Sequence, residues 1–256
     1  MIESQHIYGD SSRLFLNTEL GCTSACTYCY LPSEGFPIGL SRTQAASRIS
    51  TDTLITSLIK DVRFRSGQSG TLLSIGCFSE AWDPRNRQDT LFLIKKLLEL
   101  GNSIQLSTKR KVGIVDLKEI VSSRYWRGQL SLYISSATIS HWDEHEPRTV
   151  APAIRFQSFA SCGEVGVSAC LYIKPLIPKV TIKDWSLYGV VMSDYQIPAI
   201  VGERFVTELF EDVSPISKTL FVIHDDEVQT MRQKLAAFGP VFVKSEDALN
   251  YLRKKE

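Results

Sequence analysis

The chain has 256 residues, of which 43% are hydrophobic and 22% are charged, a composition typical of a packed globular domain and unlike that of a disordered chain. Its 29 basic and 28 acidic residues nearly balance, whereas a strong nucleic-acid binder usually carries an obvious basic excess. The sequence shows neither a secretory signal nor an apolar stretch long enough to span a bilayer, so we expect a cytoplasmic protein without membrane contact. In that reducing compartment, the six cysteines are expected to be thiols or metal ligands rather than disulfides.

Strand and helix patterns alternate along the first 202 residues. Near-continuous apolar strands separated by helices predict an α/β fold with a parallel sheet. Right-handed crossovers would curl about six such units into a partial or full βα barrel. We expect strands at 13–20, 71–79, 103–109, 129–137, 165–175 and 197–202, and helices at 51–64, 86–101, 116–123, 149–163 and near 181–193.

The remaining residues continue the alternation on a smaller scale. We predict two domains, a barrel core at 1–202 and a small α/β C-terminal extension at 203–256. In the extension, strands at 219–223 and 240–244 are candidates to pair with each other in a small sheet. Helices are expected at 225–238 and 245–255.

The segment "GCTSACTYCYL" places Cys22, Cys26 and Cys29 on one short loop after the first strand. Three thiolates on such a loop are suited to an iron–sulfur cube, because cysteine sulfur is the usual ligand of its irons. Three ligands for four irons leave one iron open for chemistry. The alternative is a structural zinc ion, which prefers four ligands and would need Cys77, Cys162 or Cys170 as the fourth. That alternative describes a zinc-stabilised barrel without catalysis.

The Cys-x3-Cys-x2-Cys spacing, with an aromatic residue before the third cysteine, resembles the radical S-adenosylmethionine (radical SAM) enzymes. Further segments, "CFSEAWDP", "STKR", "EHEPRT" and "IKPLIP", resemble the spore photoproduct lyase branch of that family over residues 13–200. The resemblance implies that Cys22, Cys26 and Cys29 hold a [4Fe-4S] cluster, whose free iron chelates S-adenosyl-L-methionine. Reductive cleavage of that cofactor gives a 5′-deoxyadenosyl radical, which abstracts hydrogen from the substrate.

The same resemblance implies cofactor contacts at Tyr28 beside the adenine, at Ser79 and Glu80 for the methionyl ammonium, and at Lys109 and Ser135. Tyr28, Lys109 and Ser135 each have a structural alternative. Tyr28 is equally suited to pack beneath the loop, and Lys109 begins a basic run whose members are expected in solvent. A shift of one residue along the strand would put Ser136 in the place of Ser135, because neighbouring strand residues face opposite sides.

Cys77 and Tyr30 match the cysteine and tyrosine that relay a hydrogen atom in the lyase branch, so they are candidate catalytic residues. The alternative for Cys77 is a core position, because free cysteine is among the most buried residue types. Cys162 and Cys170 are predicted core residues. Glu146, Arg155 and Lys174 are expected near the site, the first two in capping or salt-bridge roles, and Trp82 at the mouth of the barrel.

These features predict a radical SAM enzyme with lyase-like carbon–carbon bond chemistry on a nucleobase, a nucleic acid or a related substrate. The alternative keeps the cofactor chemistry but makes a ribosomally made peptide or a small metabolite the substrate. In either case the resemblance implies an electron donor such as a flavodoxin or a ferredoxin.

Overall fold

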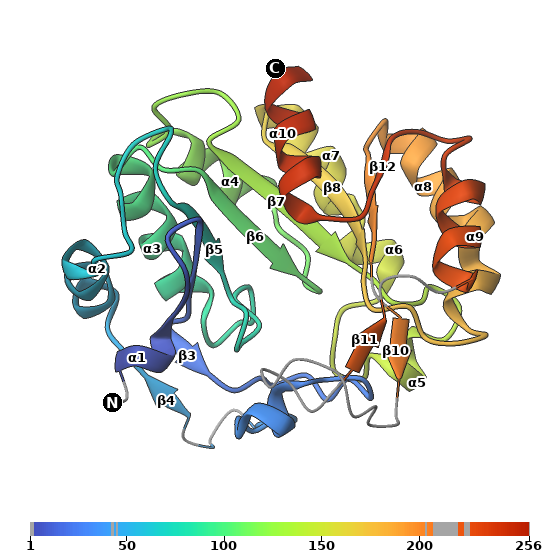
Figure 1. Ribbon diagram of the computed structural model, residues 1–256, viewed down its shortest axis with the longest axis horizontal. Coiled ribbons are helices and arrows are strands. Elements are labelled where there is room, and N and C mark those ends of the chain that lie inside the picture. The colour runs from blue at the N-terminus through green and yellow to red at the C-terminus, as the bar shows by residue number, and fades with distance from the viewer. Residues whose placement is uncertain are drawn as a thin grey trace.

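The computed structural model describes residues 3–41, 44, 46–202, 204–206, 220–222 and 226–255, and its centre is an eight-stranded sheet (Figure 1). The strand order is β1-β2-β5-β6-β7-β8-β9-β12, with β1 antiparallel to β2 and every other pair parallel. The predicted α/β class is confirmed. The sheet is a partial and not a closed barrel, because β1 and β12 stand at its two edges and are not paired with each other. The strands are β1 (Ile7–Gly9), β2 (Arg13–Leu16), β5 (Leu72–Ile75), β6 (Ile104–Thr108), β7 (Leu130–Ser135), β8 (Ser168–Ile173), β9 (Ala199–Val201) and β12 (Val241–Phe242).

Helices join the parallel strands and pack on the outer face of the sheet (Figure 1). They are α2 (Thr51–Lys60), α3 (Arg87–Glu99), α4 (Ile114–Val121), α6 (Pro152–Arg155), α7 (Gln157–Val165), α8 (Trp185–Tyr195) and α9 (Asp226–Leu235). The single helix expected at 149–163 is in fact two, α6 and α7, and the first begins at Pro152, which suits an initial helical turn. Gly101 lies just after the end of α3 with a φ of +80°, a conformation that suits glycine at the end of a helix.

Shorter elements frame the edge of the sheet where the parallel strands end. They are α1 (Glu3–His6), β3 (Glu19–Leu20), η1 (Leu31–Glu34), β4 (Ser47–Arg48), α5 (Trp142–His145) and η2 (Thr181–Asp184). The segment that follows β3 runs along that edge, toward which the arrows of β6 and β7 point (Figure 1).

The two faces of the sheet differ in polarity. Leu14, Leu73 and Leu106 are fully buried against the outer helices. The residues that alternate with them on the inner face include Ser74 and Gln105. The strands are therefore less continuously apolar than expected, because only their outer face meets the main hydrophobic core.

The C-terminal segment contacts the inner face through α10 (Ser245–Lys255). Ala248 and Leu252 of this helix form a cluster with Tyr133, Cys170 and Ile200 of the sheet. The expected pairing of 219–223 with 240–244 is wrong. Instead, β12 extends the main sheet beside β9, and β11 (Leu220–Val222) pairs with β10 (Arg204–Val206). The division at residue 202 stays a prediction.

In the described parts of the chain, no helix combines the length and the apolar character needed to cross a membrane.

Candidate active site

A pocket of about 310 Å³ lies where the parallel strands end, and every residue predicted for the site lines it. Cys77 follows β5, Lys109 follows β6, and Ser135 is the last residue of β7. Parallel strands present their carboxyl ends at one edge, so residues far apart in sequence meet there. The ten predicted residues are Cys22, Cys26, Tyr28, Cys29, Tyr30, Cys77, Ser79, Glu80, Lys109 and Ser135.

The cysteine loop is tied to its surroundings by backbone hydrogen bonds. Gly21 N–H donates to the Phe78 carbonyl at 2.9 Å, and Cys22 N–H donates to the Pro37 carbonyl at 3.0 Å. Gly21 has a φ of +114°, and a Cβ at this position would lie 3.0 Å from the Pro37 oxygen. Glycine is therefore required where the chain enters the loop.

The thiols of the loop are protonated in the absence of a metal. Burial raises the pKa of Cys22 and of Cys26 to about 11, and it raises the pKa of Cys29 as well. Metal ligands must be thiolates, so binding of iron here would release protons.

A buried arginine anchors the first half of the loop. Arg110 Nη2 donates to Asp83 Oδ2 at 2.8 Å and to the hydroxyls of Thr23 and Ser24, each at 3.2 Å. Thr23 also donates to Asp83. The loop between Cys22 and Cys26 is thus held by a polar network whose charges are shielded from water.

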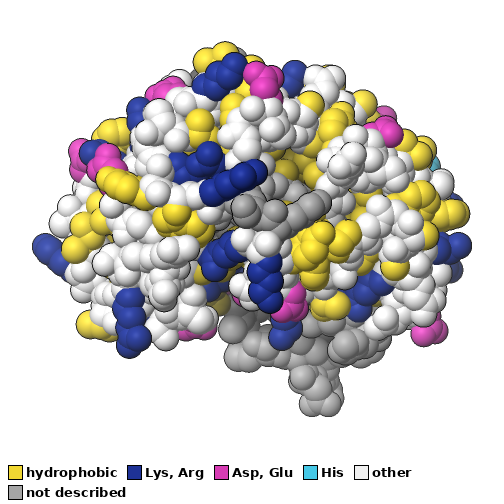
Figure 2. Space-filling model, turned by 90° about the horizontal axis from the view of Figure 1, so that it is seen from above, with side chains coloured by type: hydrophobic (Ala, Val, Ile, Leu, Met, Phe, Trp, Pro, Cys, Tyr) yellow, Lys and Arg dark blue, Asp and Glu magenta, His cyan; other side chains and the backbone are white. Residues whose placement is uncertain are grey.

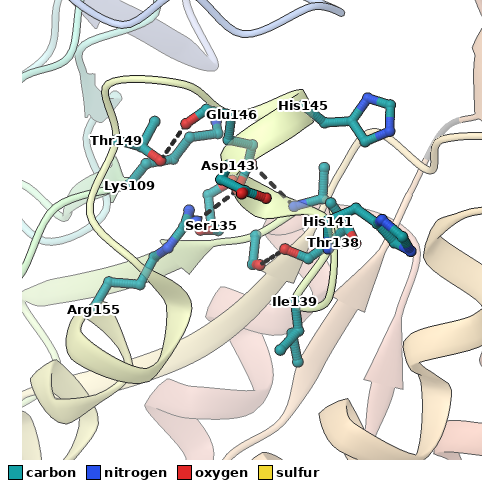
Figure 3. Close-up of polar contacts among 12 residues, drawn as sticks. Lys109, Ser135, Thr138, Ile139, His141, Asp143, His145, Glu146, Thr149 and Arg155 are labelled. Carbon is teal, nitrogen blue, oxygen red and sulfur yellow. Dashed lines mark hydrogen bonds and ion pairs between the residues drawn. The ribbon is translucent and has the colours of Figure 1, made fainter.

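A second buried ion pair anchors the other half. Arg155 Nη2 lies 2.6 Å from Glu146 Oε2, and both side chains are fully buried. Arg155 Nη1 donates to the Ser135 carbonyl at 2.7 Å, and Figure 3 shows this arginine pointing toward the end of β7. Glu146 accepts from the Tyr28 hydroxyl and, at 3.1 Å, from Ala137 N–H. The predicted salt-bridge role of Glu146 and Arg155 is confirmed.

Two serine hydroxyls in the pocket have no hydrogen-bond partner among the described residues. They belong to Ser79 and Ser135, and both oxygens are buried. A buried hydroxyl without a partner costs free energy, so each oxygen is suited to receive a group of a bound molecule. Ser136 instead donates to the Thr138 carbonyl and does not line the pocket, which places Ser135 on the pocket side of the strand.

Glu80 and Lys109 lie side by side on the pocket wall. Glu80 Oε1 accepts from Thr108 Oγ1 at 2.5 Å and from Trp82 N–H at 3.1 Å, and Oε2 accepts from Lys109 N–H at 2.9 Å. Burial alone would lower the pKa of Lys109, but Cys26, Glu146 and Glu80 raise it above its ordinary value. The ammonium lies 5.6 Å from the centre of the Tyr28 ring. Lys109 therefore stays a cation in the pocket wall.

Tyr30 and Cys77 are in contact, although not through the thiol. The Tyr30 hydroxyl donates to the Cys77 carbonyl. The Cys77 sulfur accepts from Asn17 Nδ2 at 3.4 Å, and Asn17 Oδ1 is held by Phe78 N–H at 2.7 Å. Burial raises the pKa of Cys77 to about 12, so it is a neutral thiol that lines the pocket.

Three predictions from sequence have different outcomes. Trp82 does not stand at the mouth of the barrel; it is 2% exposed and belongs to the main core. Cys162 and Cys170 are confirmed as core residues. Neither lines the pocket, so of the three candidates for a fourth zinc ligand only Cys77 lies in the pocket with the loop cysteines.

Several lining residues were missed by sequence reasoning. The signal was present, since each alternates along a strand with a buried aliphatic residue. It was not used, because a serine or glutamine in an apolar strand carries no chemical motif. These residues are Arg13, Ser74, Gln105, Ser107 and Tyr172.

The three loop cysteines are donors of the kind that an iron–sulfur cluster uses. Among the described residues, no three His, Cys, Asp or Glu side chains are arranged around one metal ion. The three loop cysteines nevertheless line one pocket, and the sulfurs that hold a cube bind separate irons.

Comparison with known proteins identifies the fold. No family model matches the sequence, and no curated protein matches it. A cysteine-to-serine variant of spore photoproduct lyase superposes with a TM-score of 0.62 and 13% identity, over 89% of this chain and 74% of that one. The fold is that of spore photoproduct lyase.

Two further solved structures carry a cofactor. Another spore photoproduct lyase variant, with bound AdoMet and dinucleoside spore photoproduct, gives a TM-score of 0.60 at 13% identity and covers 91% of this chain and 76% of its own. SuiB from Streptococcus suis, bound to S-adenosylmethionine, gives 0.59 at 15% identity and covers 92% of this chain but 51% of its own. The fold shared with spore photoproduct lyase therefore hosts this cofactor in both structures.

Proposed function

We propose that this chain is a radical SAM enzyme with the fold of spore photoproduct lyase. One observation carries the proposal. Three cysteines of a single loop line the same pocket as two buried hydroxyls that have no partner among the described residues, a carboxylate and a half-buried lysine. Two solved structures that share the fold, a spore photoproduct lyase variant and SuiB, hold S-adenosylmethionine.

Each group of residues suits a different part of the cluster or of the cofactor. Cys22, Cys26 and Cys29 would each ligate one iron of a [4Fe-4S] cluster. Glu80 and the Ser79 hydroxyl are suited to the ammonium of the cofactor, since acceptors bind a cation strongly. The Lys109 ammonium is suited to its carboxylate.

The adenosyl part of the cofactor needs an apolar wall and a hydrogen-bonding group. Tyr28 is buried beside the loop, and its hydroxyl is fixed by Glu146. Ser135 presents a hydroxyl from the end of β7. When bound, the cluster and S-adenosylmethionine would supply a one-electron cleavage that yields a carbon radical for hydrogen abstraction.

The test is anaerobic reconstitution with iron and sulfide. We expect a brown protein with about four irons and broad absorbance near 400 nm, since cysteine thiolates hold such clusters. Addition of a reductant and S-adenosylmethionine should release 5′-deoxyadenosine. Cys29→Ala should lose the iron and this product, whereas the matched variant Cys162→Ala, in the core, should keep both. A colourless protein with one zinc ion would contradict the proposal.

We further propose that the reaction is lyase-like and that Cys77 returns a hydrogen atom to the substrate radical. The geometry that supports this role is a neutral thiol in the pocket, held by Asn17. Because Asn17 donates to the sulfur, the S–H hydrogen is directed away from that amide. Tyr30, in contact with the Cys77 backbone, is proposed to pass the radical onward.

Cys77→Ala tests this role. We expect iron content and 5′-deoxyadenosine release to stay at the wild-type level, because neither needs the thiol. In a reductant-containing reaction in deuterated water, the wild type should carry solvent deuterium into its product, and the variant should lose or divert that product. If Cys77→Ala turned over at the wild-type rate, the proposed hydrogen-atom transfer would be wrong, and Cys77 would be a packing residue.

For the substrate we propose a nucleobase, a nucleic acid or a related compound, as in the dinucleoside-bound neighbour. On the face shown in Figure 2, basic and acidic side chains are interspersed, with several Lys and Arg side chains near its middle. A peptide or a small metabolite is the second candidate, favoured by the near-neutral net charge of +1. A flavodoxin or ferredoxin is the proposed electron donor.

A further inference from the structure

A single buried guanidinium, that of Arg110, joins three segments around the cysteine loop. Its Nη2 donates to Asp83 Oδ2 at 2.8 Å and to the hydroxyls of Thr23 and Ser24 at 3.2 Å each. Its Nη1 donates to the Arg148 carbonyl at 2.5 Å. The ion-paired side chains are only 11% and 8% exposed, so water competes little for these hydrogen bonds.

Arg148 completes a circuit of hydrogen bonds around one loop residue. Its Nη1 donates to the Gly39 carbonyl at 2.5 Å, and Gly39 N–H donates to the Ser24 carbonyl at 2.8 Å. Ser24 is therefore held through its hydroxyl by Arg110 and through its carbonyl by Gly39. Arg148 has a φ of +62°, which is uncommon for a residue other than glycine. Such a conformation persists where the surrounding contacts impose it.

The backbone of the loop is also hydrogen-bonded to the segment just before Arg148. Ala25 N–H donates to the Pro147 carbonyl at 3.2 Å, and Thr27 N–H donates to the His145 carbonyl at 3.0 Å. None of these hydrogen bonds uses a thiol, so all of them can form before a metal binds.

One hydrogen bond of the loop does reach a candidate metal ligand. Ser24 N–H donates to Cys22 Sγ at 3.3 Å. Because Ser24 is held on two sides by other contacts, the direction of this N–H is set by the protein. The two arginines thus act on the position of the Cys22 sulfur without touching it.

We propose that Arg110 and Arg148 form a clamp that holds the cysteine loop in its ligating shape before a metal is bound. Their hydrogen bonds go to oxygen atoms and not to sulfurs, so both are positioning residues. The inference rests on the proposed function only in naming a [4Fe-4S] cluster as the group that the loop receives. A loop that is already ordered binds more tightly, because less conformational entropy is lost on binding.

The experiment is hydrogen exchange of the metal-free protein, followed by mass spectrometry of a peptide covering residues 22–29. We expect protection of this peptide in the wild type. Arg110→Lys keeps the charge beside Asp83 but loses the planar fork of donors, so its loop peptide should exchange about tenfold faster or more. Arg148→Ala removes the contact with Gly39 and should speed exchange about twofold to tenfold.

Arg63→Lys is the matched control. Arg63 pairs with Asp61 and donates to the Gly9 carbonyl at 2.9 Å, in the segment that leads into β5, so its replacement should leave the loop peptide at the wild-type rate. Peptides from β6 and β7 should keep their protection in every variant. If Arg110→Lys fails to fold, Arg110→Met combined with Asp83→Asn, which removes both charges of the pair, takes its place.

The inference is overturned if the loop peptide of the metal-free wild type is unprotected, or if it exchanges at the wild-type rate in both Arg110→Lys and Arg148→Ala. An equal loss of protection in β6 and β7 would also overturn it, because Arg110 would then support the whole fold.

Reconstitution with iron and sulfide separates this inference from the proposed function. Residues that orient metal ligands typically change metal affinity 10–100-fold when they are substituted, so loaded Arg110→Lys should lose iron to a chelator about tenfold faster than the wild type. A wild type with a protected loop but no cluster would contradict the proposed function and leave the clamp intact.

Discussion

At the scale of single residues, the site depends on charges that are out of reach of water. Glu146 and Arg155 are fully buried, and the Glu146 carboxylate also holds Tyr28 and the backbone of Ala137. A buried ion pair adds little net stability to a fold, because removing both charges from water is costly. Removing one partner is strongly destabilising, because the other charge is then buried without compensation. The pair therefore fixes two walls of the pocket, the Tyr28 ring and the end of β7, relative to each other.

We predict that Glu146→Gln lowers the free energy of unfolding by about 3–5 kcal/mol, because Arg155 loses its counter-charge. Urea denaturation at pH 7 measures the change. Glu164→Gln is the control, since its pair with Lys118 is exposed on both sides and should contribute about 0–1 kcal/mol. Equal losses in the two variants would show that burial of the pair has no energetic consequence.

At the scale of elements, the turn after β7 is held by a carboxylate from η2, the short helix that follows β8. Asp184, at the end of η2, accepts hydrogen bonds from Thr138 Oγ1 at 2.7 Å, from Ile139 N–H at 2.7 Å, and from both the N–H and the hydroxyl of Ser140. Burial would raise the pKa of Asp184, but these hydrogen bonds lower it below its ordinary value of 3.8. The turn keeps Ser135 and Ala137 in place beside the pocket.

A lowered folded-state pKa means that Asp184 stabilises the fold above pH 3.8 and that this contribution is lost as the pH falls through the folded value. We predict that Asp184→Asn costs about 1–3 kcal/mol at pH 7 and that the difference from the wild type shrinks toward pH 3. Urea denaturation at a series of pH values measures this. Asp52→Asn, exposed at the start of α2, should change stability by under about 0.5 kcal/mol at every pH. A difference for Asp184→Asn that does not vary with pH would refute the assignment.

At the scale of the whole molecule, the inner face of the sheet is closed by the C-terminal helix. Leu252 and Ala248 of α10 pack on Tyr133, Cys170 and Ile200 of the sheet. Glu246 of the same helix forms an ion pair with Arg13, which lines the pocket. β12 continues the main sheet beyond β9. The C-terminal segment thus extends the sheet and, through Ser245 and Glu246, positions Arg13 in the pocket wall.

We predict that Leu252→Ala destabilises the barrel itself by about 2–4 kcal/mol, the usual cost of a cavity in a packed core. Tryptophan fluorescence during urea denaturation measures it, because the four tryptophans lie between Trp82 and Trp185. Asn250→Ala, on the exposed side of α10, should leave the transition unchanged. If residues 203–256 unfolded independently, the fluorescence transition of Leu252→Ala would match that of the wild type.

The α/β class and the order of most elements follow from local signals in the sequence, and the resemblance to a known family supplied ten of the residues that line the pocket. Hydrophobic periodicity marks strands and helices, and the cysteine spacing marks a loop at a strand end. The register at Ser135 needed the structure, because one residue along a strand reverses the face. Trp82 was misplaced for a similar reason, since an aromatic after a strand can turn to the core as readily as to the pocket.

Two features could be found only in the folded molecule. They are the set of inner-face strand residues that line the pocket and the packing of α10 on the inner face of the sheet. Arg13 lies in β2 and Glu246 in α10, so 233 positions separate two side chains that touch. No local pattern encodes such a pair, because the contact depends on where the last helix docks on the sheet. The cysteine spacing of the loop is a local feature and is visible in the sequence. The surroundings of Arg13 in the pocket wall depend on packing between residues far apart in the sequence.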